Sequence, residues 1–142
     1  MRAGFSLVEL VVVLAVAGVL LTLGLPSFTS WRDRRAVDRA THEVMAFYQS
    51  ARFLAVARSR FVRVTFAGDS LRAVFQGVAD SVAFDRPGPA RHGVTLVASR
   101  TSIVIAPTGI GWGGANTKIV LRRGGTGDSL TTSRLGRLKR WD

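Results

Sequence analysis

The chain has 142 residues, no cysteine and a formal net charge of +11. This length suffices for one domain with a single modest core, and the missing cysteine excludes a disulfide framework and a thiolate metal site. The two histidines, His42 and His92, lie far apart in the sequence, which argues against a histidine-rich metal site. The excess of basic residues favours negatively charged partners, such as nucleic acid, anionic lipid or an acidic protein.

The first predicted element is a long apolar helix. Residues 5–25 form a run of 21 residues in which Glu9 is the only ionisable side chain. A helix of about this length crosses a ~30 Å hydrocarbon layer. A cleaved secretory signal would have a shorter apolar region with a small-residue cleavage site after it. Here the small residue Gly4 precedes the run and a charged helix follows it, so we expect a retained helix.

Glu9 is the unusual residue of this segment. A carboxylate costs about 2.5–3.5 kcal/mol at the centre of a membrane helix and less near its end. It is therefore either a tolerated interfacial charge or a charge that meets a partner in an assembled state. If the chain were cut after Gly4, the new amino group at Phe5 would lie about one helical turn from Glu9. The Phe5 ammonium of a neighbouring copy could then neutralise this carboxylate.

The helical pattern continues beyond the apolar run. Apolar residues recur at spacings of three and four, which predicts an amphipathic helix that ends near residues 57–59 and packs on a sheet. The stripe consists of Val37, Ala40, Val44, Phe47, Ala51 and Leu54.

From residue 60 the apolar pattern changes to a period of two, which indicates strands. Loops are predicted at 85–93, 107–116 and 122–128, where breaker residues cluster. The glycine-rich loop at 107–116 lacks the spacing of a phosphate-binding loop. A long helix followed by antiparallel strands predicts an α+β fold. The predicted strands are 61–66, 71–75, 94–98, 102–106, 118–121, 129–133 and 137–141.

The N-terminal residues Gly4-Phe5-Ser6-Leu7-Val8-Glu9 resemble the class III signal of type IV pilins and of type II secretion pseudopilins. The resemblance implies a leader at 1–4, a transmembrane and assembly helix at 5–26, and an exported pilin-like domain at 27–142 in which the helix runs to about 58. It also implies cleavage between Gly4 and Phe5 by a prepilin peptidase, N-methylation of Phe5, and an assembly role for Glu9. Gly18 and Pro26 match positions where the helix of the family is weak, and each disfavours helix on physical grounds.

The same resemblance implies partners and a location. The partners are other pilins or pseudopilins, the prepilin peptidase and an inner-membrane assembly platform. The chain would cross the bacterial inner membrane once, with its N-terminus in the cytoplasm and its domain outside. A simple charge count opposes this topology, because the cluster Arg32, Arg34 and Arg35 follows the helix and Arg2 alone precedes it. We give the leader motif precedence because the charge rule is statistical.

The C-terminal region resembles the GspH/FimT group of minor subunits. Residues 105–109 match its "F-x-P-x-G" segment with Ile105 in place of Phe, and residues 136–139 resemble its "G-R-x-R" element with Lys139 at the last basic position. The group contains type II secretion tip pseudopilins and FimT/FimU-type minor pilins, some of which bind DNA. The predicted function is therefore filament initiation or tip assembly and protein secretion. The alternative is DNA binding for uptake, through Gly136, Arg137, Lys139, Arg140 and Arg134.

A plainer interpretation of these residues stays open. Arg137 is then a solvated or ion-paired charge, and Trp141, which could stack on a base, caps the core instead. No nucleophile motif, paired-carboxylate spacing or metalloprotease motif is present in the sequence. We therefore expect a protein that is not an enzyme and binds no cofactor.

Overall fold

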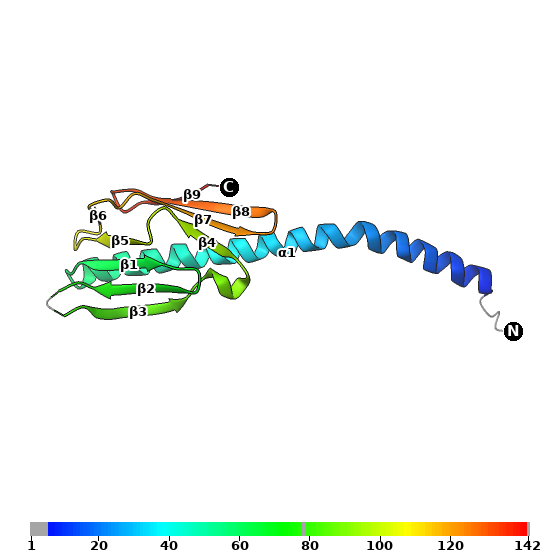
Figure 1. Cartoon of the computed structure of the whole chain (residues 1–142), viewed down its shortest axis with the longest axis horizontal. Coiled ribbons are helices and arrows are strands. Elements are labelled where there is room, and N and C mark those ends of the chain that lie inside the picture. The colour runs from blue at the N-terminus through cyan, green and yellow to red at the C-terminus, as the bar shows by residue number, and fades with distance from the viewer. Residues whose placement is uncertain (1–5, 78, 142) are drawn as a thin grey trace. The chain divides into compact units, whose positions relative to one another are not determined.

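The computed structural model describes residues 6–77 and 79–141, and the side chains of these residues apart from 23–27. One helix, α1 (Leu7–Ala57), is followed by nine strands and a short 3-10 helix, η1 (Pro89–His92). The chain divides into two compact units, Met1–Arg32 and Asp33–Asp142. The predicted α+β class, a long helix followed by antiparallel sheet, is confirmed (Figure 1).

The first unit consists of the N-terminal part of α1. Its large apolar side chains face solvent on every side of the helix, with 54–79% of each exposed from Leu7 to Leu21. Near the end of this unit, the rings of Phe28 and Trp31 stack with centroids 6.0 Å apart. Among the side chains that the structure describes in this unit, none is fully buried, so this apolar surface is available for contact with lipid or with another chain.

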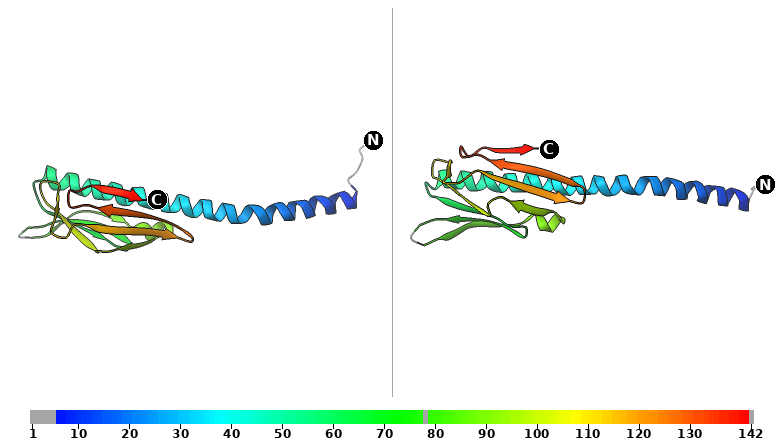
Figure 2. Two further views of the ribbon diagram at one scale, coloured as in Figure 1. Left: turned by 90° about the horizontal axis from the view of Figure 1, so that it is seen from above. Right: turned by 45° about the horizontal axis from the view of Figure 1, so that its top comes forward.

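In the second unit, the strands form two antiparallel sheets where the sequence predicted one. Sheet A has the order β3-β2-β1-β5-β6, and sheet B has the order β4-β7-β8-β9. Both lie along the part of α1 that belongs to this unit (Figures 1 and 2). The strands are β1 (Val62–Phe66), β2 (Ser70–Phe75), β3 (Ser81–Pro87), β4 (Thr95–Ala98), β5 (Ser102–Ile105), β6 (Gly111–Trp112), β7 (Thr117–Arg123), β8 (Thr126–Thr132) and β9 (Leu138–Trp141).

The core of this unit is the interface between α1 and the inner faces of the sheets. Five of the six residues of the predicted stripe are at most 1% exposed: Val37, Ala40, Val44, Phe47 and Ala51. The sixth, Leu54, is only half-buried, and its neighbour Ala55 is fully buried instead. Burying such side chains is the main stabilising contribution in a domain without disulfides.

The sequence-based strand assignment also needs corrections at the loops. The residues predicted as the loop 85–93 include the end of β3, and the loop 107–116 includes β6. The predicted loop 122–128 is instead a tight hairpin in which Gly124 and Gly125 connect β7 to β8. Gly124 has φ +54°, the left-handed conformation that two-residue hairpin turns require and that glycine adopts without strain.

Candidate functional site

The N-terminal site residues lie partly beyond the described chain. The leader 1–4, its cleavage residue Gly4 and the predicted methylation site Phe5 are outside the described residues. Glu9 lies in the first turn of α1, exposed, and its backbone N–H donates to the Ser6 hydroxyl at 3.2 Å. The Glu9 carboxylate forms no ion pair with any residue in the described part. A carboxylate in the first turn is favourable for the helix itself, because it faces the positive end of the helix dipole.

α1 runs without interruption through both positions where helix weakness was predicted. A side-chain carbon at Gly18 would meet nothing within 4 Å, so packing does not explain the glycine. The helix also continues through Pro26. The idea that the segment between them melts in a filament stays a prediction.

Within the described residues, no helix is both long enough and apolar enough to cross a membrane. The predicted span 5–25 includes residue 5 and the side chains of 23–25, which are outside what the structure describes.

The predicted basic residues of the C-terminal element divide into separate groups. Arg134 and Gly136 lie in the turn between β8 and β9, and Arg137 follows them, exposed. Lys139 is exposed on β9. Arg140 points the other way, because side chains alternate along a strand. The structure thus brings Arg134 and Arg137 together at the turn and separates Arg140 from them.

Arg140 connects β9 to the helix and to β8. Its guanidinium contacts Asp38 on α1 at 2.8 Å and Asp128 on β8 at 2.6 Å. The Asp128 side chain is only 10% exposed, and its second partner is the buried Thr41 hydroxyl at 3.1 Å. This arrangement neutralises a carboxylate at the edge of the core, so the geometry gives Arg140 a structural role.

Gly136 packs directly on the other predicted motif segment, which ends at Gly109. Both glycines have positive φ, +76° at Gly109 and +75° at Gly136. A side-chain carbon at Gly136 would lie 2.4 Å from the Gly109 carbonyl oxygen, closer than real contacts allow. Arg52, near the end of α1, donates from Nε to that same carbonyl at 2.9 Å. The two short motif segments therefore pack against each other, and Arg52 of the helix hydrogen-bonds to this contact. We call the contact between Gly109, Gly136 and Arg52 the joint.

The outer face of sheet B carries three cations and a tryptophan on its strands β7 and β9. Alternation along the strands places Lys118 and Arg122 of β7 and Lys139 and Trp141 of β9 on this face, and all four are exposed. Lys139 Nζ lies 3.6 Å from the centroid of the Trp141 ring, and Trp141 Nε1 donates to the Thr131 hydroxyl at 2.9 Å. We call Lys118, Arg122, Lys139 and Trp141 the basic face.

The basic face borders a shallow depression of about 490 Å³. Its floor is made of small and hydroxyl-bearing residues of the β7–β8 hairpin, among them Gly125, Thr126 and Ser129. The one carboxylate in its lining, Asp128, is held by Arg140. The surface can therefore accept an anion without displacing a carboxylate.

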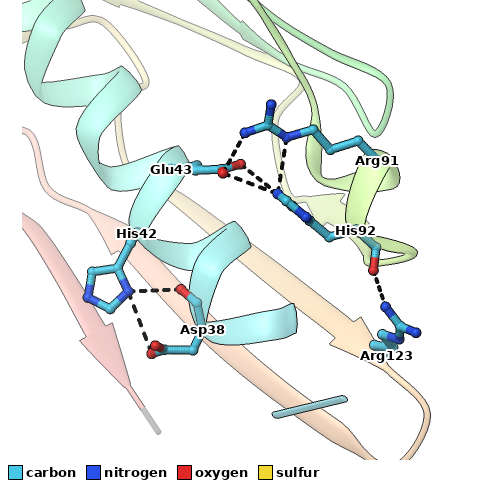
Figure 3. A network of polar contacts seen from close by, with 6 residues as sticks. All are labelled: Asp38, His42, Glu43, Arg91, His92 and Arg123. Atoms are coloured by element: carbon cyan, nitrogen blue, oxygen red, sulfur yellow. Dashed lines mark hydrogen bonds and ion pairs between the residues drawn. The ribbon is translucent and has the colours of Figure 1, made fainter. Parts of the chain in front are cut away.

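A second polar cluster fastens η1 to α1 (Figure 3). Glu43 of the helix contacts Arg91 at 2.5 Å and His92 Nε2 at 3.0 Å. Arg123 donates to the His92 carbonyl oxygen and contacts Asp33 at 2.9 Å. Partial burial raises the pKa of the Glu43 carboxyl, but hydrogen bonds from Arg91 and His92 outweigh it and hold that pKa below its ordinary value.

This cluster explains His92 without a metal. In the described part of the chain, no three of the residue types His, Asp and Glu gather in a way that could hold a metal ion. His42 lies apart from the cluster and bonds Asp38 of its own helix.

Comparisons with known proteins show which motif and which fold the chain shares with them. Residues 1–25 match the model of the prokaryotic N-terminal methylation motif. Two fimbrial proteins of Pseudomonas aeruginosa are each 28% identical to the chain over 114 residues, which is 80% of this chain and 73% of each relative. Crystal structures of the P. aeruginosa type IV minor pilin FimU, in two crystal forms, superpose with TM-scores of 0.65 and 0.62. Their sequence identities are 19% and 17%, over 77% and 74% of this chain and 90% and 92% of FimU.

The chain carries the N-terminal methylation motif and has the fold of a type IV minor pilin. The motif at its N-terminus and the fold of its second unit are independent observations that agree. The prediction that this pilin-like chain is not an enzyme agrees with the likeness, since the matched motif and fold are those of pilins.

Sequence reasoning missed one residue of the pilin-like domain. Arg52 carries no sequence signal of its role, because its partner Gly109 lies 57 residues further along the chain. Two glycines at the ends of short motifs signal special backbone geometry. They do not show which side chain closes the joint.

Proposed function

We propose that the chain is a minor subunit of a type IV pilus or a type II secretion pseudopilus, which acts in filament initiation or tip assembly. The observation that carries the proposal is the Glu9 carboxylate, the one charge among the described residues 6–22 of α1, where the large apolar side chains are exposed. The methylation motif at 1–25 supports it, because such a motif marks a processed and assembled N-terminus.

The mechanism follows from the free energy that it costs to place the Glu9 carboxylate in an apolar environment. Prepilin peptidase cuts after Gly4 and methylates the new Phe5 amino group, and the helix is stored in the inner membrane with the domain outside. During assembly, the Phe5 ammonium of a neighbouring subunit meets Glu9. The pairing removes a charge that is unfavourable in an apolar environment. An unpaired subunit is therefore less stable in the filament than a paired one.

The exposed apolar helix supplies the attraction between subunits. Packing its side chains against other helices replaces contacts with lipid by contacts with protein, and Glu9 sets the axial position at which they fit. The assembly platform in the inner membrane supplies the work of extraction. For a type II secretion pseudopilus, the outcome is secretion of folded proteins.

The test replaces Glu9 in the producing bacterium. Glu9→Ala should remove the chain from the sheared filament fraction while its membrane level and protease resistance stay unchanged. Glu9→Asp, which keeps the charge, should retain partial incorporation. Asp69→Ala, an exposed carboxylate on the second unit, is the matched control and should incorporate normally. Normal incorporation of Glu9→Ala would eliminate the ion-pair mechanism.

The basic face favours a second candidate function, binding of DNA during uptake. Its cations would contact phosphates and Trp141 would stack on a base, which predicts binding to single strands that weakens with salt. The full chain in detergent should shift a single-stranded oligonucleotide in a gel at low salt. Lys118→Ala with Lys139→Ala should reduce that shift strongly, whereas Arg86→Ala on sheet A should not. No shift by the wild type at low salt would dismiss this candidate.

A further inference from the structure

One end of the second unit carries four exposed apolar side chains from three separate segments. They are Val56 at the end of α1, Ile110 and Trp112 around β6, and Leu135 in the β8–β9 turn; 42–67% of each is exposed. The end of α1, β6 and the β8–β9 turn gather at this end (Figures 1 and 2). We call these four residues the end patch.

The segments that carry the end patch are fixed to one another. A side-chain carbon at Gly109 would lie 3.1 Å from Val56, and the Gly111 N–H donates to the Arg134 carbonyl at 2.9 Å. The Trp112 ring packs edge-on against Phe61 with centroids 5.4 Å apart. The patch is therefore formed before any partner arrives, which lowers the entropy cost of binding.

Exposed arginines lie next to the end patch in the sequence, and Asp80, an acid of the β2–β3 turn at this end, is paired with Arg63 at 3.6 Å. Arg58, Arg134 and Arg137 are exposed, and none forms an ion pair among the described residues. The three segments 52–61, 105–114 and 133–138 contain no Asp or Glu. Aromatic residues and arginine are enriched in protein–protein interfaces, so the composition of this end fits such an interface.

Charge decides what kind of protein fits. Residues 33–142 hold 18 of the 20 basic residues (all but Arg2 and Arg32) and 8 of the 9 acidic ones (all but Glu9), a net charge of +10. Two copies that met end patch to end patch would bring the same arginines together, and those charges would repel each other. A nucleic acid fits the basic face, but offers no apolar surface to cover Val56, Ile110 and Leu135.

We propose that the end patch docks a different subunit of the same filament, through an acidic surface with an apolar centre. The proposal rests on the proposed function, because it assumes that the chain assembles with other subunits. It adds which surface is used and what chemistry the partner must present: apolar side chains opposite Trp112 and Leu135, and carboxylates opposite Arg134 and Arg137.

The first experiment places a photoreactive amino acid at Leu135 of the full chain in the producing bacterium. The matched control carries it at Val97, which is 63% exposed on the outer face of sheet B. The expected product is an adduct with another pilin-like subunit whose domain is acidic, identified by mass spectrometry. We expect this adduct to be at least about tenfold more abundant from position 135 than from position 97, because the central residues of an interface contribute most of its binding energy. An adduct with a second copy, a nuclease-sensitive adduct, or no adduct would overturn the proposal.

Filament fractions from the same cells separate the two failures. If the wild-type chain is present in sheared filaments and position 135 gives no adduct, the end patch is wrong and the assembly function stands. If the chain is absent from filaments, the assembly function fails by itself, whatever the adduct shows.

A second pair of variants tests the acidic character of the partner. With the photoreactive residue moved to Ile110, Leu135→Glu should reduce the adduct about tenfold or more, because it adds a repulsive carboxylate. Leu135→Lys removes the same apolar contact but adds a positive charge, the sign that the neighbouring arginines carry. It should therefore reduce the adduct less. If both variants reduce the adduct equally while their protease resistance is preserved, the claim that the partner surface is acidic is wrong.

Discussion

Replacing Gly136 by alanine tests the joint that connects the two C-terminal motif segments. The added carbon would lie 2.4 Å from the Gly109 carbonyl oxygen, which is backbone and cannot rotate away. The residue would also keep φ +75°, a conformation that costs a non-glycine residue about 1–2 kcal/mol. Relief of the overlap requires a backbone shift of the kind that costs about 1–3 kcal/mol in an overpacked site. The expected loss of unfolding free energy is therefore roughly 3 kcal/mol.

Gly113 provides a control that separates the two costs. It also has positive φ, +68°, but a side-chain carbon there would meet nothing within 4 Å. Gly113→Ala should therefore lose only the conformational part, about 1–2 kcal/mol. Thermal unfolding of the full chain in detergent, followed by tryptophan fluorescence, measures both variants. A domain of this size should unfold on the order of 10 °C lower for Gly136→Ala. If Gly136→Ala unfolds no earlier than Gly113→Ala, the contact between the two motifs does not stabilise the fold.

Three further predictions concern the polar contacts of the second unit. Arg52→Ala removes the donor to the Gly109 carbonyl and should cost about 1–2 kcal/mol in urea unfolding; an unchanged midpoint would show that the arginine does not close the joint. Arg140→Ala leaves the nearly buried Asp128 carboxylate without its cation and should cost about 2–3 kcal/mol, and Arg140→Met in parallel shows how much of that is lost packing. The pKa of Glu43 lies below its ordinary value of 4.5, so its stabilising contribution is complete above that pH and is lost as the pH falls through the lower folded-state pKa. Glu43→Gln should therefore lower stability at pH 6 and differ less from wild type as the pH falls below 4; a constant difference over that range would contradict the linkage.

The core was predictable because helix periodicity needs no knowledge of the partner sheet. The spacing of Val37, Ala40, Val44, Phe47 and Ala51 identified the buried side of α1 correctly. The strands β3 and β6 were missed for a physical reason. β3 is the edge strand of sheet A and is mostly exposed, so it lacks a clear alternation, and β6 has only two residues.

The site was predictable only where the signal is local. Lys139 and Arg140 were both predicted in one DNA-binding element, but side chains alternate along a strand, so β9 places them on opposite faces. The Arg140 partners Asp38 and Asp128, however, come from α1 and β8, and no local pattern pairs them. The glycine-rich sequence at 122–128 predicts a loop, whereas the structure needs only two of these glycines for a hairpin turn.

The most direct measurement for the account as a whole is mass spectrometry of the sheared filament fraction from the producing bacterium. Peptides of this chain should be present there, and its N-terminal peptide should begin at Phe5 with a methylated amino group. A chain that still begins at Met1, or one found in membranes but never in that fraction, would contradict the claim that it is processed and assembled as a pilin-like subunit.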